Sequence, residues 1–320
     1  MSSSLSSPPE GAAARPILIA GPTASGKSGL ALALAERLGG AVINADALQV
    51  YAGWRVLTAR PAAEEEARAP HRLYGFLPLD APYSVGRWLR AVEGVLAECA
   101  AEGLRPIIVG GTGLYFRALT EGLTPIPEPT PEIRAAAEAR LAALGVAGFA
   151  AEIAARDPET SARLDCANPR RLLRAWEALE QTGEGLAAWH ARTPPPPLPL
   201  DRTVPLLLSP DRATLYARCD ARFDAMLAGG ALDEARAVAA LGLPETAPGL
   251  KAVGGRELIA HVRGDSSLAE AADAAKAATR NYAKRQITWF RKRMIAWQAL
   301  SAKESSENLA AATLYAGERP

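Results

Sequence analysis

The chain has 320 residues, of which 49% are hydrophobic and 22% charged, and its formal net charge is +1. These values exclude a disordered or collagen-like chain and allow two globular domains. The balanced charge gives no general attraction to acidic partners, so a basic surface has to be local. Cys99, Cys166 and Cys219 and the three histidines are scattered without metal-ligand spacing, which predicts reduced thiols and no zinc site.

The N-terminal sequence MSSSLSSPPEGAAARP lacks the apolar centre of a signal peptide, so we expect residues 1–14 to form a disordered tail. No run reaches the ~18 apolar residues that a membrane span needs. The sequence therefore predicts a cytoplasmic protein with no membrane contact.

Strand-like and helical patterns alternate through the first part of the chain. PILIAG (16–21), AVINAD (41–46) and RPIIVGG (105–111) are short apolar runs typical of buried parallel strands. The segments KSGLALALAERLGG, after the first run, and RWLRAVEGVLAECAAEGL, before the third, have apolar residues at helical spacing. This alternation predicts an α/β fold with a parallel sheet.

The pattern changes after LTEGLTPIPEPTPE. From about Glu132 to Trp189 the periodicity is helical, and this region closes at the proline-rich linker TPPPPLPLD. TVPLLLSP then resumes a strand, and a last long helix is expected from about Ser267 to Trp297. We expect a discontinuous core and an inserted all-helical domain, whose residues are 15–121 and 201–300 for the core, 122–200 for the insertion and 301–320 for a weakly specified tail.

GPTASGKS, residues 21–28, matches the phosphate-binding pattern GxxxxGK[ST]. Gly21 and Gly26 let the backbone curl so that several N–H groups face one anion, and the helix that starts near Lys27 adds its positive dipole end. Lys27 supplies a point charge, and Ser28 supplies a hydroxyl ligand for Mg²⁺. With a strand before it and a helix after it, this motif predicts a P-loop NTPase-like sheet core.

Asp46 is the acid that ends a predicted strand. Hydrolytic P-loop enzymes usually hold Mg²⁺ with such an Asp on a second strand, but here the run Ile107–Val109 leads into Gly110-Gly111-Thr112-Gly113. Because the carboxyl ends of parallel strands meet at one edge of the sheet, we expect Asp46 to face the phosphate loop, as a base or alternatively as a helix cap. Thr112 lies at the same edge, although its glycine-rich turn is equally explained as a packing device.

KAATRNYAKRQITWFRKR, residues 276–293, contains seven Lys or Arg and no acid. Arg280, Lys284 and Arg291 share a helical face, and aromatic residues are interleaved with them. Cations with flat rings suit a phosphate backbone and unstacked bases. The alternative is a solvated basic face above aromatic core anchors.

NPRRLLRAWE (168–177) repeats this theme in the helical insertion, with Arg170, Arg171 and Arg174 within about one turn. An ordinary solvated helix face explains it equally well. Arg218 and Arg222 also share a helical face.

In combination, several motifs resemble the tRNA dimethylallyltransferase family, from about Pro16 to Arg293. They are GPTASGKS, INADALQVY, TARP (58–61), PHRLYG, YSV, PIIVGGTGLY, NPRRLLRAWE and TRNYAKRQITWFR. The resemblance implies that a dimethylallyl group passes from dimethylallyl diphosphate to the exocyclic amine of the adenosine 3′ of the tRNA anticodon, with release of diphosphate. It also implies Mg²⁺ as cofactor, the tRNA anticodon stem-loop as partner and a monomer.

The resemblance also implies roles for individual residues. Asp46 would be the general base, with Thr112 and Lys27 as further catalytic residues. The diphosphate would contact Gly21, Pro22, Thr23, Ala24, Ser25, Gly26, Lys27, Ser28 and Arg222. The tRNA would contact Asp46, Ala47, Leu48, Gln49, Thr112, Arg134, Arg170, Arg171, Leu172, Leu173, Arg174, Lys251, Ala252, Val253, Gly254, Gly255, Arg256, Lys284, Arg285, Gln286, Trp289 and Arg291.

The chain departs from the family pattern at three places. Ala47 follows the Asp where Ser or Thr is usual, which removes a hydroxyl near the base. NPRRL replaces a common Asn-Asp-Pro-Gln-Arg pattern, which affects the contacts around Asn168 and Arg170. Gly255 stands where Tyr is common, which affects a stacking or packing contact.

Three other functions stay open on the residues alone. The phosphate loop also fits a small-molecule nucleoside kinase that binds ATP. Prenylation of free adenine nucleotides would not need the basic segment. A non-catalytic RNA-binding protein with an inactive loop is the third, and the intact Lys27, Ser28 and Asp46 argue against it.

Overall fold

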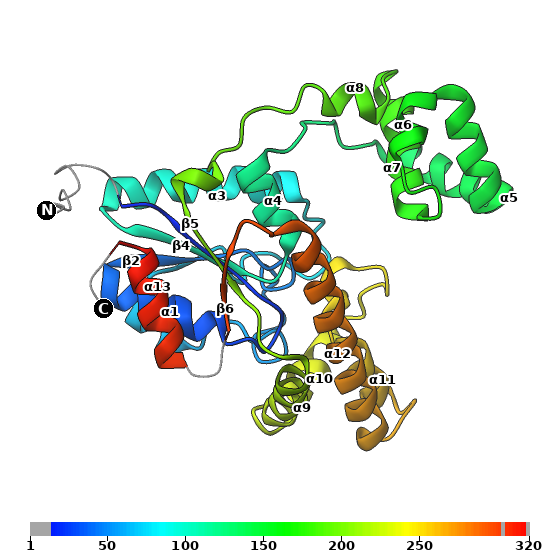
Figure 1. The fold of residues 1–320 in the computed structure, drawn as a ribbon. Coiled ribbons are helices and arrows are strands. Elements are labelled where there is room, and N and C mark those ends of the chain that lie inside the picture. Colours follow the sequence, from blue (N-terminus) through cyan, green and yellow to red (C-terminus); the bar gives the residue numbers. More distant parts are fainter. Residues whose placement is uncertain (1–13, 302–304, 318–320) are drawn as a thin grey trace, which may run out of the picture. The chain divides into compact units, whose positions relative to one another are not determined.

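The structure is a computed structural model that describes residues 14–301 and 305–317 (Figure 1). The expected tail at residues 1–14 lies almost wholly outside the described residues. The chain divides into two compact units: unit 1 comprises the described residues up to Thr120 and from Pro197 onward, and unit 2 comprises Glu121–Pro196. The return to unit 1 therefore falls inside the proline run, where the Leu198 N–H donates a hydrogen bond to the Leu119 carbonyl at 3.0 Å.

Unit 1 is built on a six-stranded parallel sheet in the order β3-β2-β4-β1-β5-β6. The central strand β1 lies between β4 and β5, with Ile17 opposite both Ile107 and Val204. The strands are β1 (Ile17–Ala20), β2 (Gly40–Asn44), β3 (His71–Arg72), β4 (Arg105–Gly110), β5 (Val204–Leu208) and β6 (Gln298–Leu300). β1 is buried along its whole length, as expected of a parallel strand covered on both faces.

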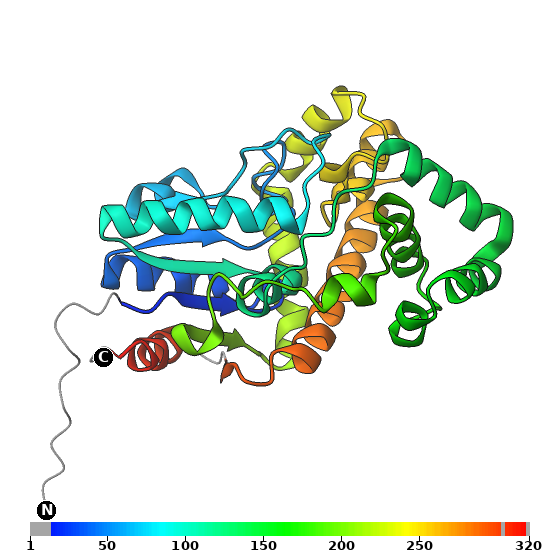
Figure 2. The same cartoon turned by 90° about the horizontal axis from the view of Figure 1, so that it is seen from above.

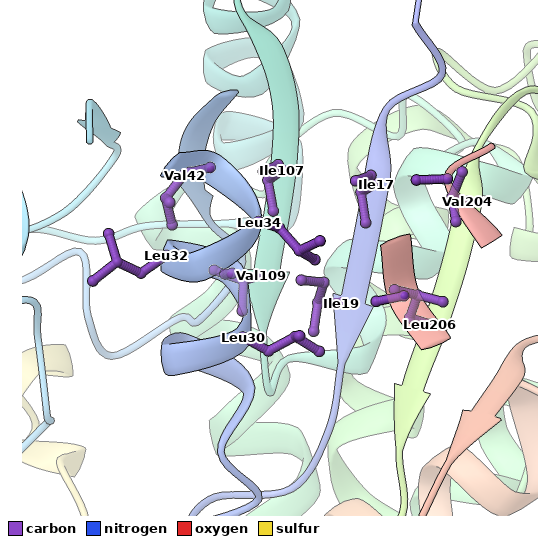
Figure 3. Packing of buried hydrophobic residues seen from close by; sticks show 14 of the residues in the cluster. Ile17, Ile19, Leu30, Leu32, Leu34, Val42, Ile107, Val109, Val204 and Leu206 are labelled. Atoms are coloured by element: carbon purple, nitrogen blue, oxygen red, sulfur yellow. The ribbon is translucent and has the colours of Figure 1, made fainter. Parts of the chain in front are cut away.

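Helices cover both faces of this sheet (Figures 1 and 2). One face packs against α1 (Lys27–Leu38) and α13 (Ser305–Tyr315), and Figure 3 shows Leu30 and Leu34 of α1 against strand residues of this cluster. The other face packs against α3 (Val85–Glu102), α4 (Gly113–Glu121) and the end of α12 (Leu268–Arg293). The alternating side chains of β1, β2, β4 and β5 thus enter two separate cores.

A third apolar cluster of unit 1 joins the segment after β2 to a group of helices. Its helices are α9 (Arg212–Ala228), α10 (Ala231–Ala240), α11 (Gly255–Arg263) and the first half of α12. The short helix α2 (Ala63–Arg68) and the 3₁₀ turns Leu200–Arg202 and Pro248–Lys251 complete unit 1. α12 begins where Ser267 and Glu270 form a capping box, in which each side chain accepts a hydrogen bond from the other's backbone N–H.

Unit 2 consists of α5 (Pro131–Arg156), α6 (Pro158–Arg163), α7 (Pro169–Thr182) and α8 (Leu186–His190). Its small core packs Phe149 and Ile153 of α5 against Leu172 and Trp176 of α7. α5 is kinked at Gly145, whose φ of 65° is not helical. Three of these helices, α5, α6 and α7, begin at a proline that follows a capping side chain. In α7 the cap is Asn168, which accepts the N–H groups of Arg170 and Arg171.

Four elements differ from the sequence expectations. The two-residue β3 and three-residue β6 are too short to leave a pattern, and the long helix ends at Arg293 rather than Trp297, because the chain turns there into β6. The tail predicted at 301–320 contains α13, whose Ala312 packs in the core. None of the helices in the described part of the chain combines the length and the apolar character that a bilayer crossing requires.

Candidate active site

Three loops meet at the carboxyl edge of the parallel sheet. They follow β1, β2 and β4, and contain residues 21–26, 45–49 and 111–112 respectively. Since these strands are neighbours in the sheet, their ends bring the phosphate loop, Asp46 and Thr112 together, as the sequence analysis expected for this type of sheet.

The phosphate loop is tightly curled between β1 and α1. Gly26 has a φ of 88°, which favours glycine, and the Ser25 N–H donates to the Pro22 carbonyl at 3.3 Å. A Cβ on Gly21 would lie 2.7 Å from the Ser25 Oγ, so that position also requires glycine. Gly26 caps α1 without any side-chain hydrogen bond, which leaves the first N–H groups of the helix open to an anion.

Lys27 lies half-buried at the start of α1, and its Nζ donates to the Pro22 carbonyl at 3.4 Å. Burial lowers the pKa of Lys27 to about 8, although the nearby Asp46 opposes this effect. Arg222 acts in the same direction as burial. A lysine with such a pKa gains a strong preference for an anionic ligand, because the ligand's charge would restore the charged form.

Asp46 is half-buried and held by its neighbours. Its Oδ1 accepts the Leu48 N–H at 2.9 Å, and its own N–H donates to the Asn44 Oδ1 at 2.8 Å. No helix begins directly after Asp46, so Asp46 is not a helix cap; its hydrogen bonds instead stabilise a local turn. The second oxygen, Oδ2, lies at the Gly111 turn, 3.3 Å from the position that a Cβ on Gly111 would take.

Thr112 fastens the turn after β4 to the segment that carries Asp46. Its Oγ1 accepts the Ala47 N–H at 2.9 Å, and its own N–H donates to the Ala45 carbonyl at 3.2 Å. The backbone segments that follow β2 and β4 lie so close together that a Cβ on Gly110 would be 2.0 Å from the Ala45 carbonyl oxygen. The hydroxyl of Thr112 therefore helps to hold Asp46 in place.

Arg222 of α9 reaches the phosphate loop from a distant part of the sequence. It donates a hydrogen bond to the Thr23 hydroxyl, and burial lowers its pKa. It lines two cavities. The smaller, of about 50 Å³, has a mixed lining: polar side chains such as Thr23, Asp46, Thr58 and Thr279 lie beside apolar ones such as Leu48, Leu57, Phe223, Met226 and Val253.

The larger cavity, of about 430 Å³, opens in front of the phosphate loop. Lys27, Ser28, Arg218 and Arg222 line it, and so does Arg60 from the segment after β2. One glutamate, at position 65, lies among these cations. The arrangement favours a ligand that carries several negative charges at one end. Arg222 is the residue common to both cavities, so it lies between the phosphate loop and the cavity that Asp46 lines.

The basic segment of α12 has two different halves. Lys276 pairs with Asp224 and Arg280 pairs with Asp220, each at 2.6 Å, so α9 neutralises the first half. In the second half, Lys284, Arg285 and Arg291 are exposed and make no ion pair within the described ranges. Only this second half presents uncompensated positive charge to a partner.

Two family profiles match the chain. The profile named IPP transferase covers residues 49–293, and the profile named isopentenyl transferase covers residues 15–76. The chain belongs to the IPP transferase family. The resemblance inferred from the motifs is thereby confirmed.

This transferase is 57% identical over 302 residues to a tRNA dimethylallyltransferase of Cereibacter sphaeroides, with 93% of each chain covered. It is 52% identical over 291 residues to the enzyme of the same name from Parvibaculum lavamentivorans, with 91% of this chain and 92% of the other covered.

Among solved structures, the full-length tRNA isopentenylpyrophosphate transferase of Bacillus halodurans aligns with a TM-score of 0.68 at 30% identity, covering 95% of this chain and 96% of that one. A eukaryotic dimethylallyltransferase described as acting on tRNA aligns with a TM-score of 0.81 at 25% identity, covering 95% of this chain and 80% of that one. The predicted P-loop NTPase-like α/β fold is confirmed.

The predicted tRNA-contacting residues of the IPP transferase are not all at the surface. Lys251 and Arg256 are exposed at either end of their segment, whereas Ala252, Gly254 and Gly255 are buried. A Cβ on Gly255 would lie 3.3 Å from the Trp54 indole. Any side chain at this position would be in tight contact with the tryptophan.

The segment that follows Asp46 makes hydrogen bonds within the protein. The Nε2 of Gln49 donates to the carbonyls of Thr58 and Ala59 at 2.9 and 2.8 Å, which leaves its carbonyl oxygen as the end available to a ligand. Ala47 and Leu48 are half-buried, and Leu48 lines the small cavity.

In unit 2, Arg134, Arg170 and Arg171 are exposed. Arg174 instead donates to the carbonyls of Ile126 and Pro127, at 3.3 to 3.5 Å. Two further members of the expected tRNA set are turned inward, since Leu172 is 0% exposed and Leu173 packs against the same core. The exposed cations of this unit are thus a smaller set than the sequence segment suggested.

Several residues of the large cavity were not among the predicted site residues. Those that carry a cationic, imidazole or phenol group are Arg60, His71, Tyr74 and Arg218. The motifs TARP and PHRLYG contained three of them and helped to identify the family, but no spacing rule assigns a role to a cation or ring in such a loop. Only the folded chain brings them to the phosphate loop.

The expected Mg²⁺ is compatible with the groups present. Ser28 offers an exposed hydroxyl on the first turn of α1, beside Lys27 in the large cavity. Mg²⁺ commonly keeps one or two protein oxygens and takes the rest of its ligands from substrate phosphates and water. The single hydroxyl of Ser28, next to the phosphate loop, is consistent with this mode of Mg²⁺ binding.

Proposed function

We propose that this chain transfers a dimethylallyl group from dimethylallyl diphosphate to the exocyclic amine of the adenosine 3′ of the anticodon in tRNA. The observation that carries the proposal is a pair of cavities that share Arg222: Lys27, Ser28 and Arg222 line the larger one, and Asp46 lines the smaller one together with apolar side chains such as Leu48 and Phe223. Relatives named tRNA dimethylallyltransferase support the choice of substrates.

The diphosphate is the leaving group, and the phosphate loop stabilises it. The open N–H groups at the start of α1, the Lys27 ammonium and the Arg222 guanidinium would face the oxygens on which negative charge develops. In the reaction the amine nitrogen forms a bond to the allylic carbon, and the carbon–oxygen bond breaks with its electron pair going to diphosphate. Preorganised donors of this kind lower the barrier without reorganising during the reaction.

Asp46 accepts the proton that the amine loses. An adenine amine is a weak nucleophile, so removing its proton as the new bond forms favours the transfer. The Oδ1 of Asp46 is occupied by the Leu48 N–H, which leaves Oδ2 as the oxygen for the proton. The adenosine has to leave its stack to reach this carboxylate, as for other enzymes that act on a base.

Ser28 would hold Mg²⁺ together with oxygens of the diphosphate, and the ion would supply additional positive charge to the leaving group. We further propose that the chain acts as a monomer in the cytoplasm. Sedimentation at micromolar concentration, with and without tRNA, tests the monomer.

The decisive experiment incubates the protein with tRNA and dimethylallyl diphosphate and measures prenylated adenosine by mass spectrometry of the nucleosides. We expect one prenyl group for each diphosphate released. Parallel incubations use ATP in place of the isoprenoid and AMP in place of tRNA. ATP turnover without prenyl transfer would favour the kinase, and prenylation of AMP as fast as of tRNA would favour the free nucleotide as substrate.

A further inference from the structure

Gln286 of α12 is turned inward, away from the exposed cations on both sides of it in the sequence. Its side chain is 6% exposed, whereas Lys284 and Arg285 are exposed. The Oε1 accepts the Thr23 N–H of the phosphate loop at 2.8 Å, and the Nε2 donates to the Gly111 carbonyl at 3.0 Å. The expected contact of this side chain with tRNA is thus replaced by two contacts inside the protein.

The partners allow one orientation of this amide. A backbone N–H only donates and a backbone carbonyl only accepts, so the oxygen has to face Thr23 and the nitrogen has to face Gly111. The fit is also steric, because a Cβ on Gly111 would lie 2.3 Å from the Nε2. The absence of a side chain at Gly111 is therefore what admits Gln286 between the two loops.

The two loops that Gln286 joins carry the two halves of the proposed chemistry. Thr23 belongs to the phosphate loop, and its hydroxyl accepts the hydrogen bond of Arg222. The turn at Gly111 continues into Thr112, which holds the segment of Asp46. The buried amide of Gln286 thus links the phosphate loop to the turn that holds the segment of Asp46, and so fixes their relative positions.

We propose that Gln286 is a positioning residue that orders the phosphate loop for the diphosphate and sets its distance from Asp46; this rests on the proposed diphosphate site. Loss of either hydrogen bond lets Thr23 and the Gly111 turn move independently. Buried hydrogen bonds of this kind correspond to about tenfold in an equilibrium constant. The expected effect is weaker diphosphate binding and slower prenyl transfer, with the tRNA affinity of the exposed cations retained.

Gln286→Glu separates a positioning role from a merely structural one, because it makes diphosphate binding depend on pH. An ionised glutamate keeps an acceptor for the Thr23 N–H but loses the donor for the Gly111 carbonyl, and it adds a negative charge near the cradle. A protonated glutamate has one donor and one acceptor, as glutamine does. Since burial raises the pKa of a carboxyl group, the protonated form becomes populated at mildly acidic pH.

The experiment measures the Kd of inorganic diphosphate with Mg²⁺ from pH 5.5 to 8.5 for the wild type, Gln286→Glu and Gln286→Leu, where each variant is expressed relative to the wild type at the same pH. We expect both variants to bind about tenfold more weakly at pH 8. As the pH falls, Gln286→Glu should recover toward the wild type and Gln286→Leu should not. The tRNA Kd of both should stay within about twofold of the wild type.

Two further variants keep the outcome interpretable. Phe290→Leu, at a buried position one turn along α12, removes core packing but neither hydrogen bond of Gln286, and its diphosphate Kd should be unchanged at temperatures below its melting point. Gly111→Ala displaces the Gln286 amide from the other side and should weaken diphosphate binding to the same extent, so it serves if the Gln286 variants do not fold.

The failures are distinguishable. If the wild type itself binds no diphosphate, the proposed function is wrong. If the wild type binds it, and the Gln286 variants or Gly111→Ala bind equally well with no difference in pH dependence, the positioning role is wrong.

Discussion

Asp46 and Lys27 show how neighbouring residues set the chemistry of single side chains in this site. Asp46 is held through Asn44 and Leu48, and its segment is fastened by Thr112, so its free oxygen is directed rather than mobile. Lys27 loses solvation beside Arg222, and its pKa is lowered to about 8. Both residues are therefore expected to have functional signatures that can be measured separately.

Asp46→Asn should lower single-turnover prenyl transfer at least ~100-fold, because the amide keeps the shape of the carboxylate but accepts no proton. The Kd for tRNA should change little, since the change is confined to the reacting end. Quenched-flow kinetics with excess enzyme and a filter-binding measurement test the two statements. Turnover near the wild-type rate would remove Asp46 as the base.

Diphosphate binding should weaken as the pH rises through about 8, because Lys27 then loses the proton that gives it charge. The effect on stability has the opposite sign. Between about 8 and its ordinary value of 10.5 the unfolded chain binds the proton that the folded chain has released, so unliganded stability from this group increases with pH. Isothermal titration with inorganic diphosphate measures the first effect, and Lys27→Arg is the control, since arginine stays charged and should remove the pH dependence. A pH-independent Kd in the wild type would contradict the assignment.

At the scale of elements, α12 combines three surfaces on one helix. Its first half pairs with acids of α9, its inner side carries Gln286, and its exposed second half carries Lys284, Arg285 and Arg291. The Trp289 ring packs against the glycine-rich turn, where a Cβ on Gly113 would lie 2.2 Å from it. The same helix thus contacts the loops at the carboxyl edge of the sheet and presents unpaired cations that a polyanion could bind.

Lys284→Ala and Arg291→Ala should each weaken tRNA binding and reduce the slope of log Kd against log salt by roughly one unit, because each cation releases counterions on contact with a phosphate. Lys276→Ala is the matched control, since the lysine on the same helix is already paired with Asp224. Filter binding between 50 and 300 mM salt, on the order of the physiological range, gives the slopes. Equal slopes for all three variants would show that this half of α12 does not face the tRNA.

At the scale of the whole molecule, unit 2 is an insertion whose two ends meet. The backbone hydrogen bond between Leu198 and Leu119 holds these ends together within unit 1, and unit 2 has its own core around Phe149 and Trp176. The cavities and the sheet belong to unit 1 alone. Each unit thus has the contacts that it needs for independent folding.

Replacing Glu121–Pro196 by a flexible Gly/Ser linker of about six residues should leave unit 1 folded, because a short chain can join ends that are already adjacent. Circular dichroism melting should stay cooperative, and the diphosphate Kd should stay within about threefold, a difference of under ~1 kcal/mol. The tRNA Kd should rise at least ~10-fold, since the exposed arginines of unit 2 are lost. Retained tRNA affinity, or loss of cooperative unfolding, would contradict this division of labour.

Much of the candidate site at the carboxyl edge of the sheet was predictable from the sequence, because local signals and one topological rule suffice for it. The pattern around Gly26 and Lys27 encodes its own loop, and apolar runs mark the central strands. The rule that parallel strands end at one edge then brings Asp46 and Thr112 to that loop. β6 and α13 were missed, since a strand of three residues leaves no periodic pattern and α13 acquires its core contacts only in the folded chain.

The sequence by itself determined the phosphate loop, the parallel sheet with its acid-bearing edge, and the family. Only the tertiary structure decided which residues of a basic or glycine-rich segment face inward: Gln286 to the two loops, Leu172 to a core, Arg280 to Asp220. The physical reason is range. A loop or a strand is specified by residues adjacent in the chain, whereas Arg280 and Gln286 find their partners Asp220 and Thr23 at 60 and 263 positions away, whose approach no local pattern encodes.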